Sequence, residues 1–334
     1  MEKLKSIDIK GGKNMEKRTD LALEAHEIYA EEQQVDKING VDISTFKKDG
    51  ISVTRVKILN DDGRRALKKP IGDYVTLEIP EYVHETQENF DSIIKMFSKE
   101  LGRMMPKRTK DSVTLVVGLG NRNITADALG PKVVDGLLVT RHLFDLMPED
   151  ISDGLVPVCA ISPGVLGITG IETNEIIKGV TQRVKPDVII AIDALASRSI
   201  SRVMTTIQLS NTGIKPGGGV GNERGGLDIE TLGVPVIAIG VPTVVDAATM
   251  ANDTIDMVIE SISSHTQKGT AFYKMLEEID KNEKYALIDE VLKKSFVNLV
   301  VTPKEVDEII DDLAEIISDG INICMHNADV GRYK

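Results

Sequence analysis

Apolar runs alternate with amphipathic stretches from residue 112 onward, and this alternation predicts the fold class. Four runs are apolar on both faces, as buried strands are: 113–120, 155–162, 186–196 and 233–243; a shorter strand is predicted at 202–210. Helical periodicity marks the stretches between them, which are 129–144, 171–184 and 244–265. Strands covered by helices on both sides predict an α/β protein, a three-layer α/β/α fold with a largely parallel or mixed sheet.

The two ends of this α/β region follow different patterns. Residues 51–80 are rich in β-formers around a turn signal at 60–63, which predicts a small β element of hairpin type. Residues 84–105 carry apolar positions on one face and predict a helix. In the mostly polar tail, Thr302–Glu305 resembles a capping box, and the helix after it has an apolar stripe and an acidic, solvated face.

The first twenty residues form a segment of their own. They contain Gly11 and Gly12, mixed charge and no apolar period, which is typical of a flexible leader. The stretch that begins at Ala22 favours helix by propensity. We therefore expect a leader, 1–20, and one folded domain, 21–334. Within that domain we distinguish the β element at 51–80, an α/β core at 112–265 and a helical tail at 266–334.

Composition narrows the classes of function. Of 334 residues, 41% are hydrophobic, which is enough for a sizeable core, and the net charge is −12. An acidic chain is poorly suited to a direct grip on nucleic acid, whose phosphates require basic patches. Two cysteines indicate no disulfide framework, and Cys159 lies in an apolar run. Neither a membrane-spanning run nor the apolar core of a signal peptide is present, so we expect a cytoplasmic protein.

Two glycine-rich segments are candidates for a nucleotide site. In the first, 116–131, a strand runs into Gly-x-Gly, but the third glycine and the ribose-binding acid of a dinucleotide fingerprint are absent. The second, 214–233, lacks the Gly-Lys-Ser/Thr of a P-loop and is better interpreted as a mobile or tightly turned loop beside a site. The nucleotide signal is therefore weak.

Two aspartates stand where ligands gather in an open α/β sheet, at the carboxyl ends of strands. Asp127 follows the first strand just before a helix, and Asp193 closes the third strand. Taken singly, each is better explained as a helix cap or, for Asp193, as an ion pair with Arg198. Together they form a pair in which one carboxyl is protonated and the other ionised. Such a pair can activate a water and protonate a leaving amine.

Other chemistries find less support in the sequence. There is no Gly-x-Ser-x-Gly elbow and no His-Glu-x-x-His, and the five histidines lie outside the strand-end loops. A cysteine nucleophile would have to be Cys159, which the pattern buries. A metal-assisted hydrolase with Asp127 and Asp193 as ligands of a hard cation stays open, although the lack of nearby histidine disfavours zinc.

Five long segments together carry a resemblance to a known family: "RTDLALEAHE", "GLGNRNITADALGPKVVDGLLVTRHL", "ISPGVLGITGIETNEII", "AIDALASRS" and "NTGIKPGGGVGNERGGLDIETLGVPVIAIGVPTVVDA". On these stretches the chain resembles, from Arg18 to the C-terminus, the germination protease (spore endopeptidase) family of spore-forming bacteria. The resemblance also implies a fold similar to that of the hydrogenase maturation endopeptidases.

The resemblance implies an activity. Members degrade small acid-soluble spore proteins during germination, are made in the forespore as self-processing zymogens, and act as homotetramers without a cofactor. Their two essential aspartates correspond to Asp127 and Asp193, and the family is grouped with aspartic-type peptidases. Their substrates are cut after an acidic residue within sequences of the Thr-Glu-Ile-Ala-Ser-Glu type.

The family's substrate pattern gives a meaning to "TDLALE", 19–24, which nearly copies it. The resemblance therefore implies propeptide cleavage between Asp20 and Leu21, which makes 21–334 the peptidase domain. An ordinary helix start, with Thr19 or Asp20 as N-cap, is the simpler interpretation of the same residues. A nucleotide-binding α/β protein and an acidic structural protein of the spore remain the alternatives to a peptidase.

Overall fold

The computed structural model describes residues 19–79, 87–147, 154–215, 225–266, 270, 284–285, 287–288, 290–292 and 299–326. Contacts divide the chain into two units. The first comprises Thr19–Asp246 and Val300–Lys334 and contains the sheet; the second comprises Met1–Arg18 and Ala247–Leu299 and contains the long helix α9, Ala247–His265. The leader lies almost wholly outside the described residues, and its expected boundary after residue 20 remains a prediction.

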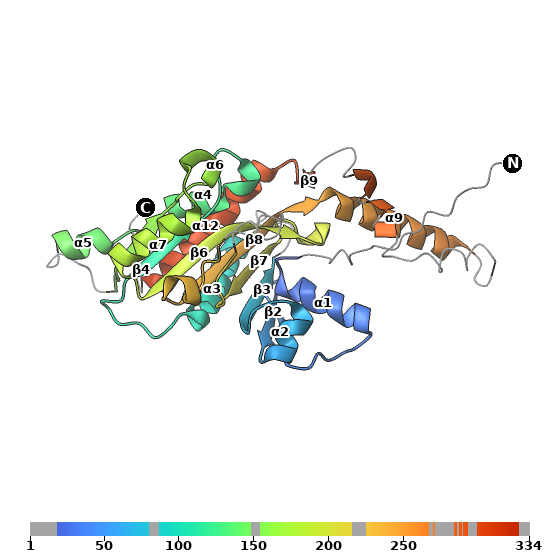
Figure 1. Cartoon of the computed structure of the whole chain (residues 1–334), viewed down its shortest axis with the longest axis horizontal. Coiled ribbons are helices and arrows are strands. Elements are labelled where there is room, and N and C mark those ends of the chain that lie inside the picture. Colours follow the sequence, from blue (N-terminus) through green and yellow to red (C-terminus); the bar gives the residue numbers. More distant parts are fainter. Residues whose placement is uncertain are drawn as a thin grey trace. The chain divides into compact units, whose positions relative to one another are not determined.

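One mixed sheet organises the first unit, with strands in the order β1-β2-β3-β7-β8-β6-β4-β5 and a short β9 beside β8 (Figure 1). The parallel half is formed by β8, β6, β4 and β5, and the other pairings are antiparallel. The strands are β1 Val41–Lys48, β2 Ile51–Ile58, β3 Gly72–Glu78, β4 Thr114–Gly118, β5 Val158–Ile161, β6 Val188–Ser197, β7 Thr206–Ser210, β8 Val236–Asp246 and β9 Val300–Val301.

Helices cover both faces of this sheet, which confirms the predicted three-layer fold. In β6, Ile190 and Ile192 join the large core cluster that includes residues of α3 (Gln87–Met104), α4 (Leu129–Asp135) and α12 (Val306–Met325). The alternate residues Ile189 and Ala191 face a second cluster that includes α7, Thr173–Val184. Because side chains alternate along a strand, residue 193 lies on the α7 side of the sheet.

The early β element differs from the prediction in extent and in connection. It begins earlier than expected, at Val41, with strand β1. The sequence did not predict β1, because this strand is mostly exposed and lacks the apolar pattern of a buried strand. The Asn60 side chain accepts hydrogen bonds from the N–H groups of Asp62 and Gly63, and this caps a helix, α2 (Asp61–Leu67), where a turn was expected. Since β3 also pairs with β7, the element continues the main sheet.

Two predicted helix boundaries were wrong. The stretch 129–144 forms α4 and a separate α5, Arg141–Leu146, because Asn322 of α12 bonds the intervening backbone at the Gly136 oxygen and the Leu138 N–H. The expected capping box does not cap α12, which begins at Val306. The Thr302 hydroxyl instead donates to the backbone oxygen of Thr243, 2.9 Å away.

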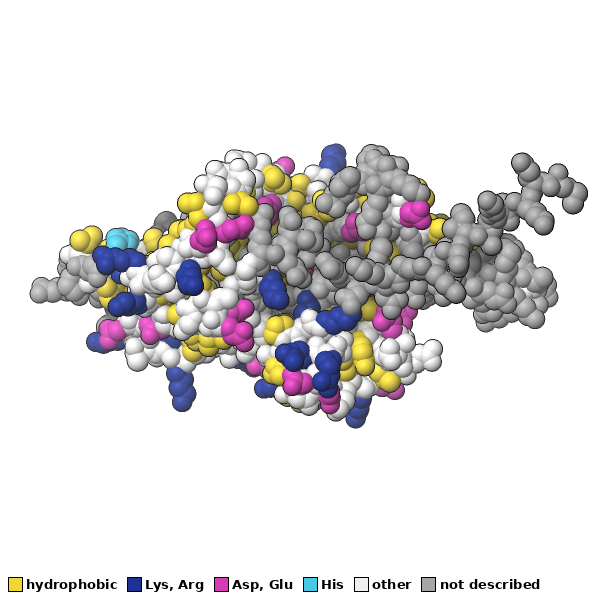
Figure 2. Space-filling view, in the orientation of Figure 1, with side chains coloured by type: hydrophobic (Ala, Val, Ile, Leu, Met, Phe, Trp, Pro, Cys, Tyr) yellow, Lys and Arg dark blue, Asp and Glu magenta, His cyan; other side chains and the backbone are white. Residues whose placement is uncertain are grey.

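The remaining elements are short, apart from one helix at the start of the described chain. They are α1 Ala22–Gln33, α6 Leu166–Thr169, α8 Ile229–Leu232 and the 3-10 helices η2 Thr125–Asp127 and η4 Ile200–Arg202. Within the described residues, no helix combines the length and the apolar character needed to cross a membrane. Basic and acidic side chains are interspersed on the face shown in Figure 2.

Candidate active site

Strand β6 holds Asp193 one residue beyond the point where its neighbour β4 ends. The neighbouring strand β4 ends opposite Ile192, whose carbonyl accepts the last sheet hydrogen bond on that side, from the N–H of Leu119 at 2.8 Å. Asp193 is the next residue of β6 and pairs with Gly240 of β8. It is only 7% exposed, and its Oδ1 accepts a hydrogen bond from the Ala194 N–H at 3.0 Å. The carboxyl of Asp193 is therefore buried in the middle of β6, which continues to Ser197 beside β8, so the prediction that Asp193 closes the strand was wrong.

The loop after β4 holds Asp127 through its own backbone. The Asn121 N–H lies 2.9 Å from Asp127 Oδ2 and 3.0 Å from the Asp127 carbonyl oxygen. Gly120 has a φ of +110°, and a Cβ there would lie 2.1 Å from that same oxygen, so this turn requires glycine. Helix α4 has Ala128 as its N-cap residue, so the simpler interpretation of Asp127 as a helix cap was wrong.

Electrostatics links the two carboxyls. Burial raises the pKa of Asp193 well above its ordinary value, and the nearby charges of Asp127 and Asp20 raise it further. Burial also raises the pKa of half-buried Asp127, which the hydrogen bond from Asn121 opposes. The structure thus brings together the two aspartates that the sequence singled out, with Asp193 the better holder of a proton and Asp127 the better anion.

The backbone at Asp20 and Leu21 lies in the same site. Leu21 is extended, with φ −82° and ψ 129°, and is the N-cap residue of α1, so the expected cap by Thr19 or Asp20 was wrong. The Asp20 carbonyl accepts hydrogen bonds from Lys69 Nζ at 2.9 Å and Gln208 Nε2 at 3.1 Å. Gln208 Oε1 accepts the Ala22 N–H at 2.6 Å. Leu21 and Ala22 are fully buried, so this bond is clamped from both sides.

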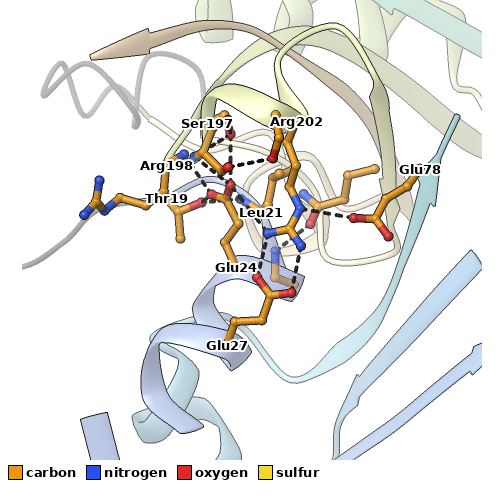
Figure 3. A network of polar contacts seen from close by, with 12 residues as sticks. Thr19, Leu21, Glu24, Glu27, Glu78, Ser197, Arg198 and Arg202 are labelled. Atoms are coloured by element: carbon orange, nitrogen blue, oxygen red, sulfur yellow. Dashed lines mark hydrogen bonds and ion pairs between the residues drawn. The ribbon is translucent and has the colours of Figure 1, made fainter. Parts of the chain in front are cut away.

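Backbone N–H groups at the end of β6 bind the acidic side chains on either side of that bond (Figure 3). Asp20 Oδ2 accepts from the Ala196 N–H at 3.1 Å. Glu24 is 2% exposed, and its carboxylate accepts from the Arg198 N–H, the Ser199 N–H and the Ser197 hydroxyl at 2.9, 3.1 and 2.9 Å.

Arg202 supports the position of Glu24. Its Nη1 lies 3.7 Å from Glu24 Oε1, while its guanidinium also pairs with Glu27 and Glu78. Strand β6 thus carries Asp193 and, a few residues later, the groups that recognise two acidic side chains.

Sequence reasoning missed Lys69 and Gln208 for different reasons. Lys69 follows α2 in a charged stretch whose pattern is that of a solvated surface. Gln208 did offer a signal, namely an amide between Ile207 and Leu209 in the middle of a strand, and it is buried on the same face as Asp193. A buried polar side chain needs a partner, and here the partner is the backbone of the Asp20–Ala22 segment.

The other candidate sites gain little from the structure. Part of the second glycine-rich segment, 216–224, lies outside the described residues, and the first is the loop that holds Asp127. Among the described residues no group of three or more His, Cys, Asp or Glu side chains is arranged to hold a metal ion. Burial raises the pKa of the half-buried Cys159 thiol, which suits a structural cysteine.

The raised pKa of Asp193 predicts a cost in stability at neutral pH. Where the folded chain holds a proton that the unfolded chain has released, stability falls as pH rises, until the folded pKa is reached. Asp193→Asn removes this buried ionisable group while keeping its shape. We therefore expect the variant to melt about 2 °C or more above the parent at pH 7, with the gap shrinking near pH 4. Thermal unfolding of both full chains measures it, and an equal or lower melting temperature at pH 7 would contradict the assigned environment.

Comparisons with known proteins agree on one family. A family model described as germination protease matches residues 22–271 and 260–332. Germination proteases from Clostridium tetani (strain Massachusetts / E88) and Caldanaerobacter subterraneus subsp. tengcongensis are each 53% identical to this chain. The matches cover 94% and 92% of this chain, and 97% and 94% of those relatives. One from Bacillus thuringiensis subsp. konkukian is 44% identical, covering 93% of this chain and 94% of the relative.

Among solved structures, the [NiFe] hydrogenase maturation protease HycI from Thermococcus kodakarensis KOD1 matches over 66% of this chain and 98% of that one. Its TM-score of 0.28 and identity of 16% are too low to carry an argument. The family model and the relatives confirm the resemblance seen in the sequence. The chain belongs to the germination protease family.

Proposed function

We propose that this protein is an endopeptidase that degrades small acid-soluble spore proteins during germination, and that it is made as a zymogen that cuts its own Asp20–Leu21 bond. One observation carries the proposal. Leu21 is extended, the Asp20 carbonyl is bound by two side chains, and the Asp20 carboxylate acts electrostatically on buried Asp193, as half-buried Asp127 does. Family membership supplies the class of reaction and its place in spore germination.

The aspartate pair supplies the acid and the base. Asp127, as the anion, takes a proton from a water whose oxygen attacks the carbonyl carbon of Asp20. Asp193, as the protonated partner, gives its proton to the Leu21 nitrogen as the carbon–nitrogen bond breaks. The products are a carboxyl group at Asp20 and an amino group at Leu21, and proton exchange returns the pair to its starting state. In this mechanism the pair holds one proton before each turnover, and the proton that Asp127 gains from water replaces the one that Asp193 gives to the leaving nitrogen.

The contacts of Asp20 and Glu24 indicate how substrates are chosen. An acidic side chain before the bond meets the Ala196 N–H, and a second one, four residues after the bond, meets the group around Ser197 and Arg202. Spore proteins with this spacing of acids are the proposed substrates. The proposed setting is the cytoplasm of the forespore and spore core, and the proposed assembly is a homotetramer, with no direct contact to nucleic acid or membrane.

A peptide copy of residues 18–28 tests the proposed function. We expect the processed enzyme to cut it between Asp20 and Leu21, and to cut a matched peptide with Glu24→Gln about 10-fold or more slowly. The reason is that an amide loses the charge-assisted hydrogen bonds of the carboxylate. Mass spectrometry of the products gives both the site and the rate. Intact peptides, together with a thermal shift on adding dinucleotide, would favour the nucleotide-binding alternative.

The same peptide assay with a chelator added tests whether the reaction instead uses a metal ion bound by the two aspartates. Cleavage that survives exhaustive chelation supports the carboxylate pair as the source of the activated water. Cleavage that is lost on chelation and restored by a divalent cation would replace that mechanism, with Asp127 and Asp193 then acting as ligands.

A further inference from the structure

We propose that Lys69 and Gln208 are catalytic residues that stabilise the negative charge developing on the scissile carbonyl oxygen. This inference rests on the proposed peptidase function and adds an electrophilic component to the aspartate pair. Lys69 Nζ and Gln208 Nε2 both donate to the Asp20 oxygen, at 2.9 and 3.1 Å. Donors aimed at an oxygen that becomes an oxyanion bind the transition state more tightly than the ground state.

The pairing of the strands places Gln208 on the same face of the sheet as Asp193. Gln208 of β7 pairs with Gly240 of β8, which in turn pairs with Asp193 of β6. Paired residues share a face of the sheet, so Gln208 and Asp193 project from the same face, two strands or roughly 10 Å apart. At the middle position a Cβ on Gly240 would lie 2.3 Å from Leu195 Cδ1, so a side chain there would displace Leu195. A carbonyl held by Gln208 therefore lies on the side of the sheet where Asp193 points.

Gln208 is fixed in the orientation that donation requires. The Ala22 N–H can only donate, and it lies 2.6 Å from Gln208 Oε1. The amide nitrogen must therefore face the other way, toward the Asp20 carbonyl. One side chain thus holds the backbone on both sides of the bond and sets the direction of its carbonyl.

Lys69 brings charge to the same oxygen. Its ammonium bridges the carbonyl oxygens of Thr19 and Asp20, at 2.8 and 2.9 Å. Burial lowers the pKa of Lys69, while the nearby carboxylates of Asp20 and Glu24 raise it and so favour the charged form. A cation with little surrounding water acts strongly on charge that develops beside it.

Self-processing of the full chain isolates the chemical step, because the bond is already bound in the site. We expect Lys69→Met and Gln208→Glu each to lower the first-order rate constant about 100-fold or more. Gln208→Glu keeps the acceptor for Ala22 and replaces the donor to the carbonyl by an anionic oxygen, which opposes the negative charge that develops there. Lys69→Arg keeps the charge and should stay within about 10-fold of the parent. Lys47→Met, an exposed lysine on β1, is the matched control and should process at the parental rate.

Hydrogen exchange distinguishes transition-state stabilisation from simple holding. In an Asp193→Asn background, which prevents cleavage, amide exchange over residues 19–25 reports whether the segment stays docked. We expect the segment to stay protected in Gln208→Glu and Lys69→Arg. Self-processing at the parental rate in Lys69→Met and Gln208→Glu would overturn the inference. A slowed variant in which the amides of residues 19–25 lose their protection would overturn it too, because the loss of rate would then come from undocking of the segment. Failure of the unmodified chain to process itself or to cut peptides would instead overturn the proposed function.

Discussion

Asp127→Asn and Asp193→Asn should each abolish self-processing, with a fall in the first-order rate constant of about 1,000-fold or more. Asparagine preserves the size and much of the hydrogen bonding of aspartate, but it cannot take up or give back a proton. In the proposed mechanism Asp127→Asn removes the base that activates the water, and Asp193→Asn removes the acid that protonates the leaving nitrogen. Mass spectrometry of the full chain over time measures the rate constant directly.

A nearby acid provides the matched control. Asp135 lies in α4, is exposed, and pairs with Arg122 outside the site. Asp135→Asn removes one carboxylate from the same region and should leave processing unchanged. Thermal unfolding shows whether each variant folds, and Asp193→Asn should be at least as stable as the parent at pH 7. Near-parental turnover in a folded Asp127→Asn or Asp193→Asn variant would refute the role of the pair.

Asp20→Lys should block processing at the bond after residue 20. The substitution removes the carboxylate that accepts from the Ala196 N–H and places an ammonium close to Lys69, whose Nζ bonds the Asp20 carbonyl. Like charges at such short range repel, so the segment cannot stay docked. We expect a loss of processing of about 100-fold or more, measured as the fraction of full-length chain over time.

Two comparisons separate recognition from damage to the enzyme. Glu31→Lys makes the same charge change in α1, on an exposed side chain outside the site, and should process normally. A chain with Asp20→Lys whose first twenty residues are removed by an engineered cleavage site should cut peptide substrates at the parental rate. Normal processing of Asp20→Lys would show that the carboxylate before the bond is not recognised.

The parts of the fold that the sequence predicted are those governed by local pattern. The strands β4, β6 and β8 are apolar on both faces, and this property identified the layered sheet and placed Asp127 after β4. It placed Asp193 at the end of a strand that in fact continues to Ser197, because the polar residue interrupts the apolar run without ending the strand. The other misses have non-local causes. The helix break after α4 depends on Asn322, far along the chain, and β1 is too exposed to carry a buried-strand pattern.

The candidate site shows the same division. Asp127, which follows β4, and Asp193, which lies in the neighbouring strand β6, could be paired by reasoning about sheets alone. Lys69 and Gln208 are separated from Asp20 by 49 and 188 residues, and only the folded chain brings them to its carbonyl. The pocket for Glu24 consists largely of backbone N–H groups, which no pattern of side-chain types can reveal.

The mass of the processed chain tests the central claim most directly. If the Asp20–Leu21 peptide lies in the site as the enzyme's own substrate, incubation of the full chain should remove residues 1–20 and leave Leu21 as the new N-terminus. Intact-mass spectrometry with sequencing of the N-terminal peptide reads this out in one experiment. The account predicts a single product that begins at Leu21. A product that begins at any other residue, or a chain that stays intact while it cuts added peptide, would contradict it.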